Sequence, residues 1–164
     1  MAMLAFAVVT YFHEEQRFRD SWIWVAIAVP MVFAVWALLA TPGAPASAAI
    51  AVVGVAVAVA ALIGIARLET TVTDEAVLVM FHGLWPTRRI KLDDIAEYAP
   101  MRYGMWDSGG WGVHFGLAGL TYNVSGNEGI HFRLKRGGRV LVGTQRPGEF
   151  AEGIAKAMAA RGAG

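Results

Sequence analysis

Few residues in this chain are able to perform acid–base or metal chemistry. There are four histidines, at positions 13, 82, 114 and 131, and no cysteine. The spacing of the histidines matches no metal-binding pattern, although His114 and His131 can face each other if they lie on adjacent strands. We therefore expect solvent-exposed or hydrogen-bonded strand histidines, with no metal and no cofactor.

Carboxylates and hydroxyls offer no better catalytic pattern. Asp93 and Asp94 are adjacent, so on a strand they would point apart, and as turn or capping residues they are ordinary. Ser108 and Ser125 lie in glycine-rich segments without the G-x-S-x-G motif of serine hydrolases, and no activating base lies nearby in the sequence. The sequence predicts no catalytic residue.

A glycine-rich segment with aromatic residues runs from Gly104 to Gly129. Its Gly-x-Gly-x-x-x-Gly pattern misses the dinucleotide fingerprint by one position, and no helix follows to receive a pyrophosphate. Tight turns, bulges and close packing of aromatic rings are the expected use of these glycines. The candidate loop residues are Gly110, Trp111, Gly112, Tyr122 and Asn123.

Basic residues give the clearest functional indication. A domain tethered to an anionic leaflet gains about 1 kcal/mol for each Lys or Arg held near that surface. Some of these charges can instead set membrane topology or lie on solvated strand edges. Nucleic acid is disfavoured, because residues 67–164 hold 12 basic against 10 acidic residues, a net charge of only +2. The candidates for contact with anionic lipid or a phosphate-bearing ligand are Arg88, Arg89, Lys91, Arg133, Lys135, Arg136, Arg139 and Arg146.

The elements that position these residues begin with a membrane segment. The chain is 56% hydrophobic and 16% charged, whereas soluble domains have about 45–50% apolar and about 25% charged residues. Residues 22–40 and 46–66 form two uncharged, apolar runs separated by a Pro- and Gly-containing turn. Each run is long enough to cross a bilayer as a helix, so we expect a two-helix transmembrane hairpin over residues 22–66.

The distribution of positive charge predicts the orientation of this hairpin. Arg17 and Arg19 precede the first run, Arg67 follows the second, and the connecting turn has no charge. The positive-inside rule then places both termini in the cytoplasm of a two-span protein of the cell membrane. Residues 1–21 combine an apolar start with alternating charged and aromatic residues, which is typical of an interfacial helix. The alternative is a start assigned upstream of the true one.

The remainder, residues 67–164, is long enough for one β-rich domain. Alternating apolar and polar residues are clearest over 129–135, where Ile130, Phe132 and Leu134 share one face. Apolar residues at helical spacing predict a C-terminal helix over residues 147–160, packed against the sheet. We expect six or seven antiparallel strands. The segments are 68–73, 76–82, 87–92, a fourth strand that follows a turn or short helical start within 93–103, and then 111–115, 129–135 and 140–142.

One stretch carries a family resemblance. The predicted order of elements resembles that of the bacterial pleckstrin-homology-like membrane proteins. It consists of a membrane hairpin, a strand pair, the sequence Arg88-Arg-Ile-Lys-Leu-Asp-Asp-Ile95, further strands and a final helix. The segments at 109–113, 122–129 and 142–147 are similar to those of a family of small uncharacterised membrane proteins. This resemblance implies an α+β fold in which a PH-like antiparallel β-barrel or sandwich is capped by the C-terminal helix, and it implies no activity.

Three functions are compatible with the sequence. The favoured one is a non-enzymatic membrane-anchored interaction or scaffold module that engages anionic lipid or a protein partner, for example by strand addition. The first alternative is an enzyme or ligand-binding protein acting on a membrane-proximal substrate through His114, His131 and Asp107. The second is an accessory subunit of a membrane complex that docks through small residues of 46–66. The oligomeric state does not follow from the sequence.

Overall fold

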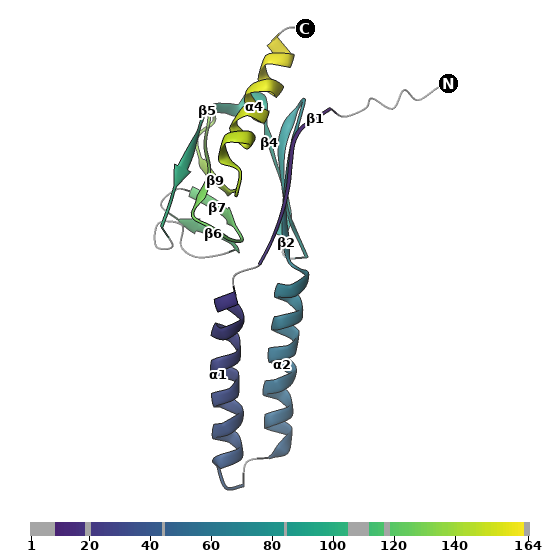
Figure 1. The fold of residues 1–164 in the computed structure, drawn as a ribbon, viewed down its shortest axis with the longest axis vertical. Coiled ribbons are helices and arrows are strands. Elements are labelled where there is room, and N and C mark those ends of the chain that lie inside the picture. Colours follow the sequence, from purple (N-terminus) through teal and green to yellow (C-terminus); the bar gives the residue numbers. More distant parts are fainter. Residues whose placement is uncertain are drawn as a thin grey trace, which may run out of the picture. The chain divides into compact units, whose positions relative to one another are not determined.

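The computed structural model describes residues 9–18, 21–43, 45–83, 85–104, 112–116 and 119–162. These residues belong to two compact units (Figure 1). One unit is Phe18–Ala66, and the other joins the chain up to Arg17 with Arg67–Gly164. The helical unit is thus inserted within the sequence of the β-rich unit.

The helical unit contains α1 (Ser21–Ala40) and α2 (Ala46–Ile65). The two helices contact each other, and Gly64 of α2 lies where an added Cβ would be 3.9 Å from the Trp24 ring of α1. Within the described residues, α2 is the one helix that is both long and apolar enough to cross a membrane. The apolar stretch of α1, Trp24–Ala40, is shorter. Both predicted apolar runs are helical, and α2 is the candidate membrane span.

The prediction of an interfacial helix over residues 1–21 is wrong for the part that the structure describes. Thr10–Arg17 is strand β1, in which Phe12, Glu14 and Gln16 are buried and the residues between them are exposed. Its antiparallel partner is β2 (Arg67–Thr73), with Arg17 opposite Arg67. Alternating polar and aromatic residues have the period of a strand, but the partner strand follows only after two helices, so local sequence did not reveal it.

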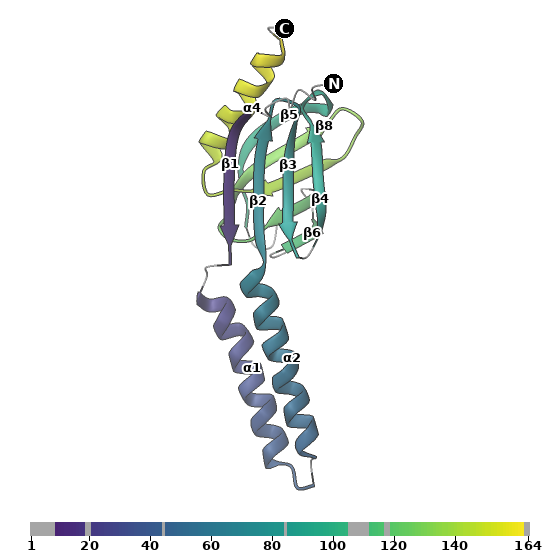
Figure 2. The same ribbon diagram turned by 90° about the vertical axis from the view of Figure 1, so that its right-hand side faces the viewer.

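The first sheet has the order β1-β2-β3-β4, where β3 is Ala76–His82 and β4 is Trp85–Lys91 (Figure 2). All three strand pairs are antiparallel. Alternate residues of β2 and β3 are fully buried, among them Leu68, Val72 and Val77, which shows that one face packs on the core. β4 is an edge strand, and its residues are exposed except Ile90.

A short 3₁₀ helix (Leu92–Asp94) leads into the second sheet, as expected from the two aspartates. This sheet has the order β5-β8-β9-β7-β6. The prediction of purely antiparallel strands is wrong at one position, because β7 and β9 are parallel neighbours. The described part of residues 67–164 contains eight strands, since the glycine-rich segment forms a hairpin rather than one strand. The strands of this sheet are β5 (Ile95–Arg102), β6 (Gly112–Gly116), β7 (Gly119–Asn123), β8 (Glu128–Leu134) and β9 (Arg139–Gly143).

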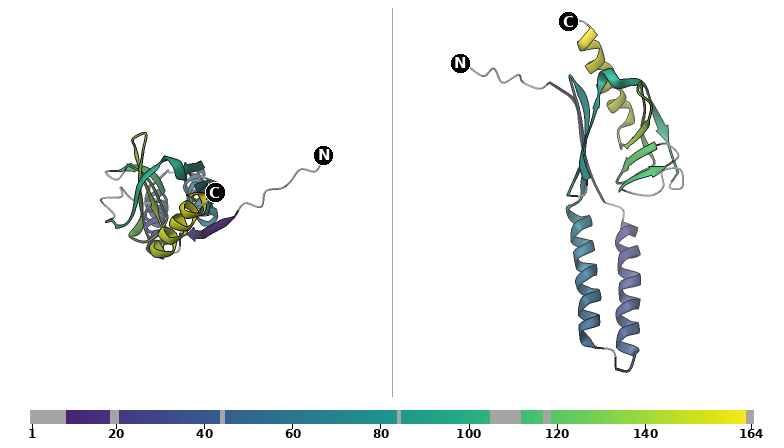
Figure 3. Two further views of the ribbon diagram at one scale, coloured as in Figure 1. Left: turned by 90° about the horizontal axis from the view of Figure 1, so that it is seen from above. Right: turned by 180° about the vertical axis from the view of Figure 1, so that it is seen from behind.

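The two sheets face each other, and their strands run in different directions (Figure 2). The described strands form two separate sheets, so the β-rich unit is a sandwich and not a closed barrel. Helix α4 (Pro147–Gly162) lies along one open side of this sandwich and contacts both sheets (Figures 1 and 3). Its Phe150 ring stacks on Phe12 of β1 at 4.8 Å and meets Phe132 of β8 at 6.0 Å, so the core includes residues from both sides of the helical insertion.

Candidate functional site

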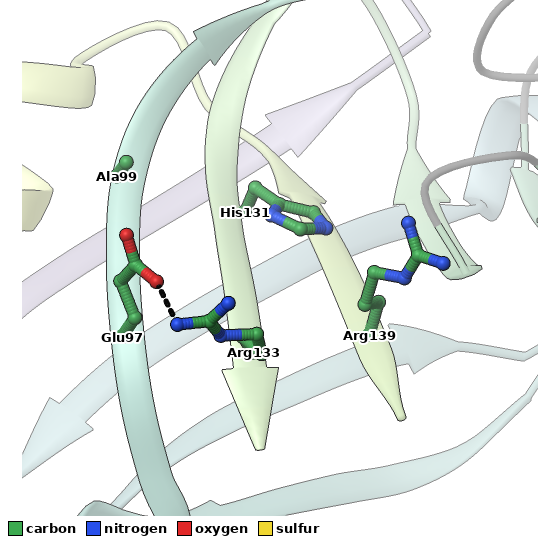
Figure 4. Close-up of a pocket in the computed structure, with 5 residues that line it drawn as sticks. All are labelled: Glu97, Ala99, His131, Arg133 and Arg139. Atoms are coloured by element: carbon green, nitrogen blue, oxygen red, sulfur yellow. Dashed lines mark ion pairs between the residues drawn. The ribbon is translucent and has the colours of Figure 1, made fainter. Parts of the chain in front are cut away.

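A pocket of about 490 Å³ lies on the outer face of the second sheet, away from the first sheet. The strand register explains how it forms. Ala99 of β5 lies opposite His131 of β8, and one step along the strands Arg133 of β8 lies between Glu97 of β5 and Arg139 of β9. Because alternate residues of a strand share one face, all five side chains project to the same side (Figure 4).

The electrostatics of this pocket are uneven. Glu97 and Arg133 form an ion pair of 2.5 Å between exposed side chains, so each largely neutralises the other. Arg139 forms no ion pair with any residue that the structure describes, and its guanidinium projects toward the same side as the His131 ring (Figure 4). The pocket thus offers one unpaired guanidinium, an imidazole and a second guanidinium whose carboxylate partner can be displaced. That set suits an anionic group.

The local sequence accounts for this arrangement. β8 alternates as predicted, with Ile130 and Phe132 buried and Arg133 exposed. The β8–β9 turn uses Gly137 and Gly138, whose φ values of 84° and 94° are strained for other residues. This tight turn returns the chain so that Arg139 lies directly beside Arg133.

The pairing of His114 with His131 that the enzyme alternative requires does not occur. His114 lies on β6 opposite Thr121 of β7, and β7 and β9 separate it from β8. Both ring nitrogens of His114 are buried and have no hydrogen-bond partner among the residues that the structure describes, and desolvation by burial lowers the pKa of the ring. Asp107, the third residue of that hypothesis, lies outside the described residues. The two histidines therefore do not form one site.

The predicted basic residues on β4 do not join the pocket. Arg89 is paired with Glu75, and Lys91 lies opposite Ala76, at the end of the first sheet where β3 begins. Arg88 lies opposite Val79 and is exposed.

The remaining basic candidates are also dispersed. The backbone N–H of Lys135 donates to the backbone carbonyl oxygen of Asp94 at 2.7 Å. The Arg136 Nε lies 3.5 Å from the side-chain carboxylate of the same aspartate. Arg146 pairs with Glu149 at 3.1 Å and donates to the carbonyl oxygen of His13 at 2.6 Å. Of the eight predicted residues, the structure brings Arg133 and Arg139 together.

The glycine–aromatic candidates contribute to packing where the structure describes them. Tyr122 is buried, which raises the pKa of its hydroxyl, and Arg88 partly opposes this shift. Asn123 is buried beside Gly143, where an added Cβ would be 2.9 Å from its Oδ1. Gly112 has a φ of 96°, a conformation that favours glycine. Gly110 and Trp111 lie outside the described residues.

Sequence reasoning missed a buried polar cluster that attaches β1 to the loop before α4. Glu14 is 6% exposed, and its carboxylate accepts hydrogen bonds from the Thr144 hydroxyl and, at 3.0 Å, from the backbone N–H of Gln145. Gln16 donates to the carbonyl oxygen of Gly143 at 2.8 Å. The only signal in the sequence is that two of the three buried positions of this alternating strand hold polar residues, Glu14 and Gln16, which becomes visible once β1 is recognised as a strand.

A second polar cluster lies on the outer face of the first sheet. A hydrogen bond of 2.7 Å joins the Glu69 carboxylate of β2 to His82 Nε2 of β3. The Nδ1 atom of His13 on β1 lies 3.9 Å from the other carboxylate oxygen of Glu69. Among the described residues, no group of three metal-ligating side chains has the geometry to hold a metal ion. We regard this cluster as an ion-pair network on an exposed sheet face.

Comparisons with known proteins do not extend these observations. No family model, curated protein or solved structure matches this chain. The resemblance to pleckstrin-homology-like membrane proteins therefore stays a prediction from the sequence.

Proposed function

We propose that this protein is a membrane-anchored interaction module with two membrane spans. Its β-rich unit binds, without chemical turnover, an anionic group in the pocket formed by Glu97, Ala99, His131, Arg133 and Arg139. The bound group is a phosphate or carboxylate of a lipid or of a protein partner. Two observations support the proposal. The first is the strand pairing that encloses the helical unit, and the second is that Arg139 forms no ion pair with a described residue.

Strand pairing supports the second membrane span. β1 precedes α1, β2 follows α2, and the two strands are hydrogen-bonded neighbours. Paired strands lie on the same side of a membrane, so the chain between them crosses it an even number of times. If α2 crosses, a second crossing is required, and α1 is the apolar helix available for it. This parity argument supports the hairpin independently of the length of the apolar stretch in α1.

Charge supports the orientation. Arg17 and Arg67 flank the helical unit, while residues 41–43 and 45, between the helices, are uncharged. The positive-inside rule then places the β-rich unit in the cytoplasm.

The pocket chemistry favours binding over catalysis. The carboxylate of the pocket is paired with Arg133, so His131 is the one group of the described lining that could act as a general base, and a base alone needs a nucleophile or a bound water to activate. His131 is flanked by Arg133 and Arg139 on the neighbouring strand positions, an environment that suits an anion. The described residues around His131 include no nucleophile.

Topology is tested by cysteine labelling, because the natural chain has no cysteine. Thr41→Cys reports on the connection between the helices, and Asp74→Cys reports on the β-rich unit. In sealed inverted membrane vesicles, a membrane-impermeant maleimide should label the cysteine at 74 at once and the cysteine at 41 only after the vesicles are opened. Equal labelling of both before opening would refute the two-span arrangement.

Ligand binding is tested with inorganic phosphate and the full chain in phosphatidylcholine nanodiscs, by calorimetry. Arg139→Gln removes one charge-assisted contact, which we place at the low end of its range, about 1.5 kcal/mol, because the side chain is exposed; affinity should fall about tenfold. Glu97→Gln should strengthen binding, since it frees Arg133. Lys156→Gln is the matched control, because Lys156 pairs with Glu152 on α4. An Arg139→Gln protein that binds phosphate as the control does would refute the site.

A further inference from the structure

The end of the first sheet where β1 ends and β2 begins carries an exposed aromatic residue. Arg17, Arg67 and His82 lie opposite one another across β1, β2 and β3 at this end. The β3–β4 turn follows directly, and it places Trp85 opposite Phe81. Trp85 is 50% exposed, although large aromatic side chains usually bury most of their area. We call this end of the β-rich unit the tethered end.

A second exposed aromatic residue belongs to the same end. β6 lies toward the end of the first sheet at which β2 begins, at the same height in both side views (Figures 1 and 2). Its Phe115 is 83% exposed. Two large exposed aromatic side chains at one end of a small domain are more than scattered surface apolar residues require.

Chain connectivity limits how far this end lies from the helices. One residue, Ala66, separates α2 from β2, so Arg67 is within about 7 Å of the end of α2 along the chain. β4 is two strand spacings from β2, which is about 10 Å. If α2 crosses the bilayer, these lengths keep the tethered end close to the headgroup layer. Tryptophan is enriched in that layer, because its ring is apolar and its N–H is polar.

We propose that Trp85 and Phe115 insert into the headgroup layer of the membrane that α2 crosses, and that this contact fixes the β-rich unit against the membrane surface. The inference rests on the membrane anchoring proposed above. It assigns the contact to aromatic insertion rather than to basic residues, because ion pairing reduces the positive charge of the two arginines that border the helical unit. Arg17 and Arg67 are both close to Glu15, at 2.8 and 3.9 Å, which leaves a formal charge of +1 for the three residues. The contact should therefore depend only weakly on anionic lipid.

The experiment uses the full chain with single cysteines, reconstituted in phosphatidylcholine vesicles with and without phosphatidylglycerol. Thr87→Cys, exposed on β4, carries an environment-sensitive fluorophore beside Trp85, and Asp74→Cys carries it at the opposite end of the same sheet. Lipids with a nitroxide at the headgroup should quench the fluorophore at 87 but not the one at 74, in both lipid mixtures. Strong quenching at 87 only with phosphatidylglycerol would overturn the aromatic assignment.

A variant series tests which side chains make the contact. Trp85→Ser combined with Phe115→Ser should abolish the quenching at residue 87 and shift the emission to the red. Val9→Ser is the matched control, because Val9 is also 50% exposed but precedes Thr10, at the other end of β1. Quenching that persists in the double variant would overturn the inference.

A further reporter separates this inference from the proposed anchoring. Val57→Cys lies on α2, where the natural side chain is 62% exposed, and its fluorophore should be quenched by nitroxides placed deep in the acyl chains. Deep quenching at 57 without quenching at 87 would refute aromatic insertion and leave the anchoring intact. Absence of quenching at 57 would refute the anchoring itself, and with it this inference.

Discussion

Replacing Glu14 with Ala tests whether the buried polar cluster holds β1 in the first sheet. The carboxylate is 6% exposed and accepts hydrogen bonds from the Thr144 hydroxyl, the Gln145 N–H and the Gln16 side-chain amide. Gln16 also donates to the carbonyl oxygen of Gly143, so removal of the carboxylate leaves the other two donors without this partner. An unsatisfied buried donor costs about 1–3 kcal/mol. Taking about 1.5 kcal/mol for each, the variant should lose about 3 kcal/mol of the free energy that keeps β1 paired.

Hydrogen exchange of the full chain measures this loss locally. β1 is an edge strand of its sheet, so its amides exchange through local opening rather than through global unfolding. A loss of about 3 kcal/mol corresponds to about a hundredfold faster exchange in β1. Amides of β8 in the other sheet should change much less. Glu14→Gln should lie between the two proteins, because its amide oxygen still accepts one hydrogen bond.

The control is Glu152→Ala, which removes an exposed carboxylate paired with Lys156 on the surface of α4. It should leave β1 exchange unchanged. Exchange in the Glu14→Ala protein within twofold of the natural protein would refute the reasoning, because the cluster would then contribute nothing measurable to the attachment of β1.

Three further predictions concern the β-rich unit. Burial raises the pKa of the Tyr103 hydroxyl to about 12, so the contribution of this neutral group to stability is complete below pH 10 and is lost as pH rises toward 12. Tyr103→Phe should remove this loss of stability at alkaline pH, measured by urea titration. An unchanged alkaline profile would contradict the prediction. Desolvation lowers the pKa of His114, so protonation favours the unfolded chain and stability falls as pH drops below about 6.5. His114→Leu should make the free energy of unfolding depend less on pH in this acid range. A stronger dependence on pH would be inconsistent with a ring that has no described partner. An added Cβ at Gly153 would be 2.8 Å from Cβ of Phe12, so Gly153→Ala should cost about 1–3 kcal/mol in thermal melting, whereas Gly148→Ala meets no atom within 4 Å and should be neutral or slightly stabilising; equal effects of the two would refute close packing of α4 on β1.

Several elements follow from the sequence because neighbouring residues determine them. The alternation over 129–135 correctly predicts that Ile130 and Phe132 of β8 are buried. The spacing of Phe150, Ile154, Ala157 and Met158 predicts the apolar stripe of α4, in which the first three are buried and Met158 is half-buried. The apolar character of 46–65 is sufficient for the one span candidate that the structure contains. In each of these segments, the periodicity or length of the apolar pattern is a property of a single helix or strand. The element can therefore be predicted without knowing which distant segment packs against it.

The site required the tertiary structure. His114 and His131 have a spacing that permits a pair, yet the insertion of β7 and β9 between their strands separates them. Arg133 and Arg139 come together because a tight turn pairs β8 with β9, and the unpaired state of Arg139 follows only from which carboxylates lie within reach.

Local sequence patterns thus predict the division of this protein into an uncharged helical segment and a β-rich domain with a C-terminal helix. Only the tertiary structure assigned residues 10–17 to that domain, because β1 and β2 are distant in the chain and their pairing is non-local. The structure also brings the buried Glu14 of β1 next to Thr144, and the pairing of β1 with β2 supports the two-span topology proposed above. Hydrogen bonding between backbones that are distant in sequence leaves no local pattern, which is the physical reason that it had to be observed.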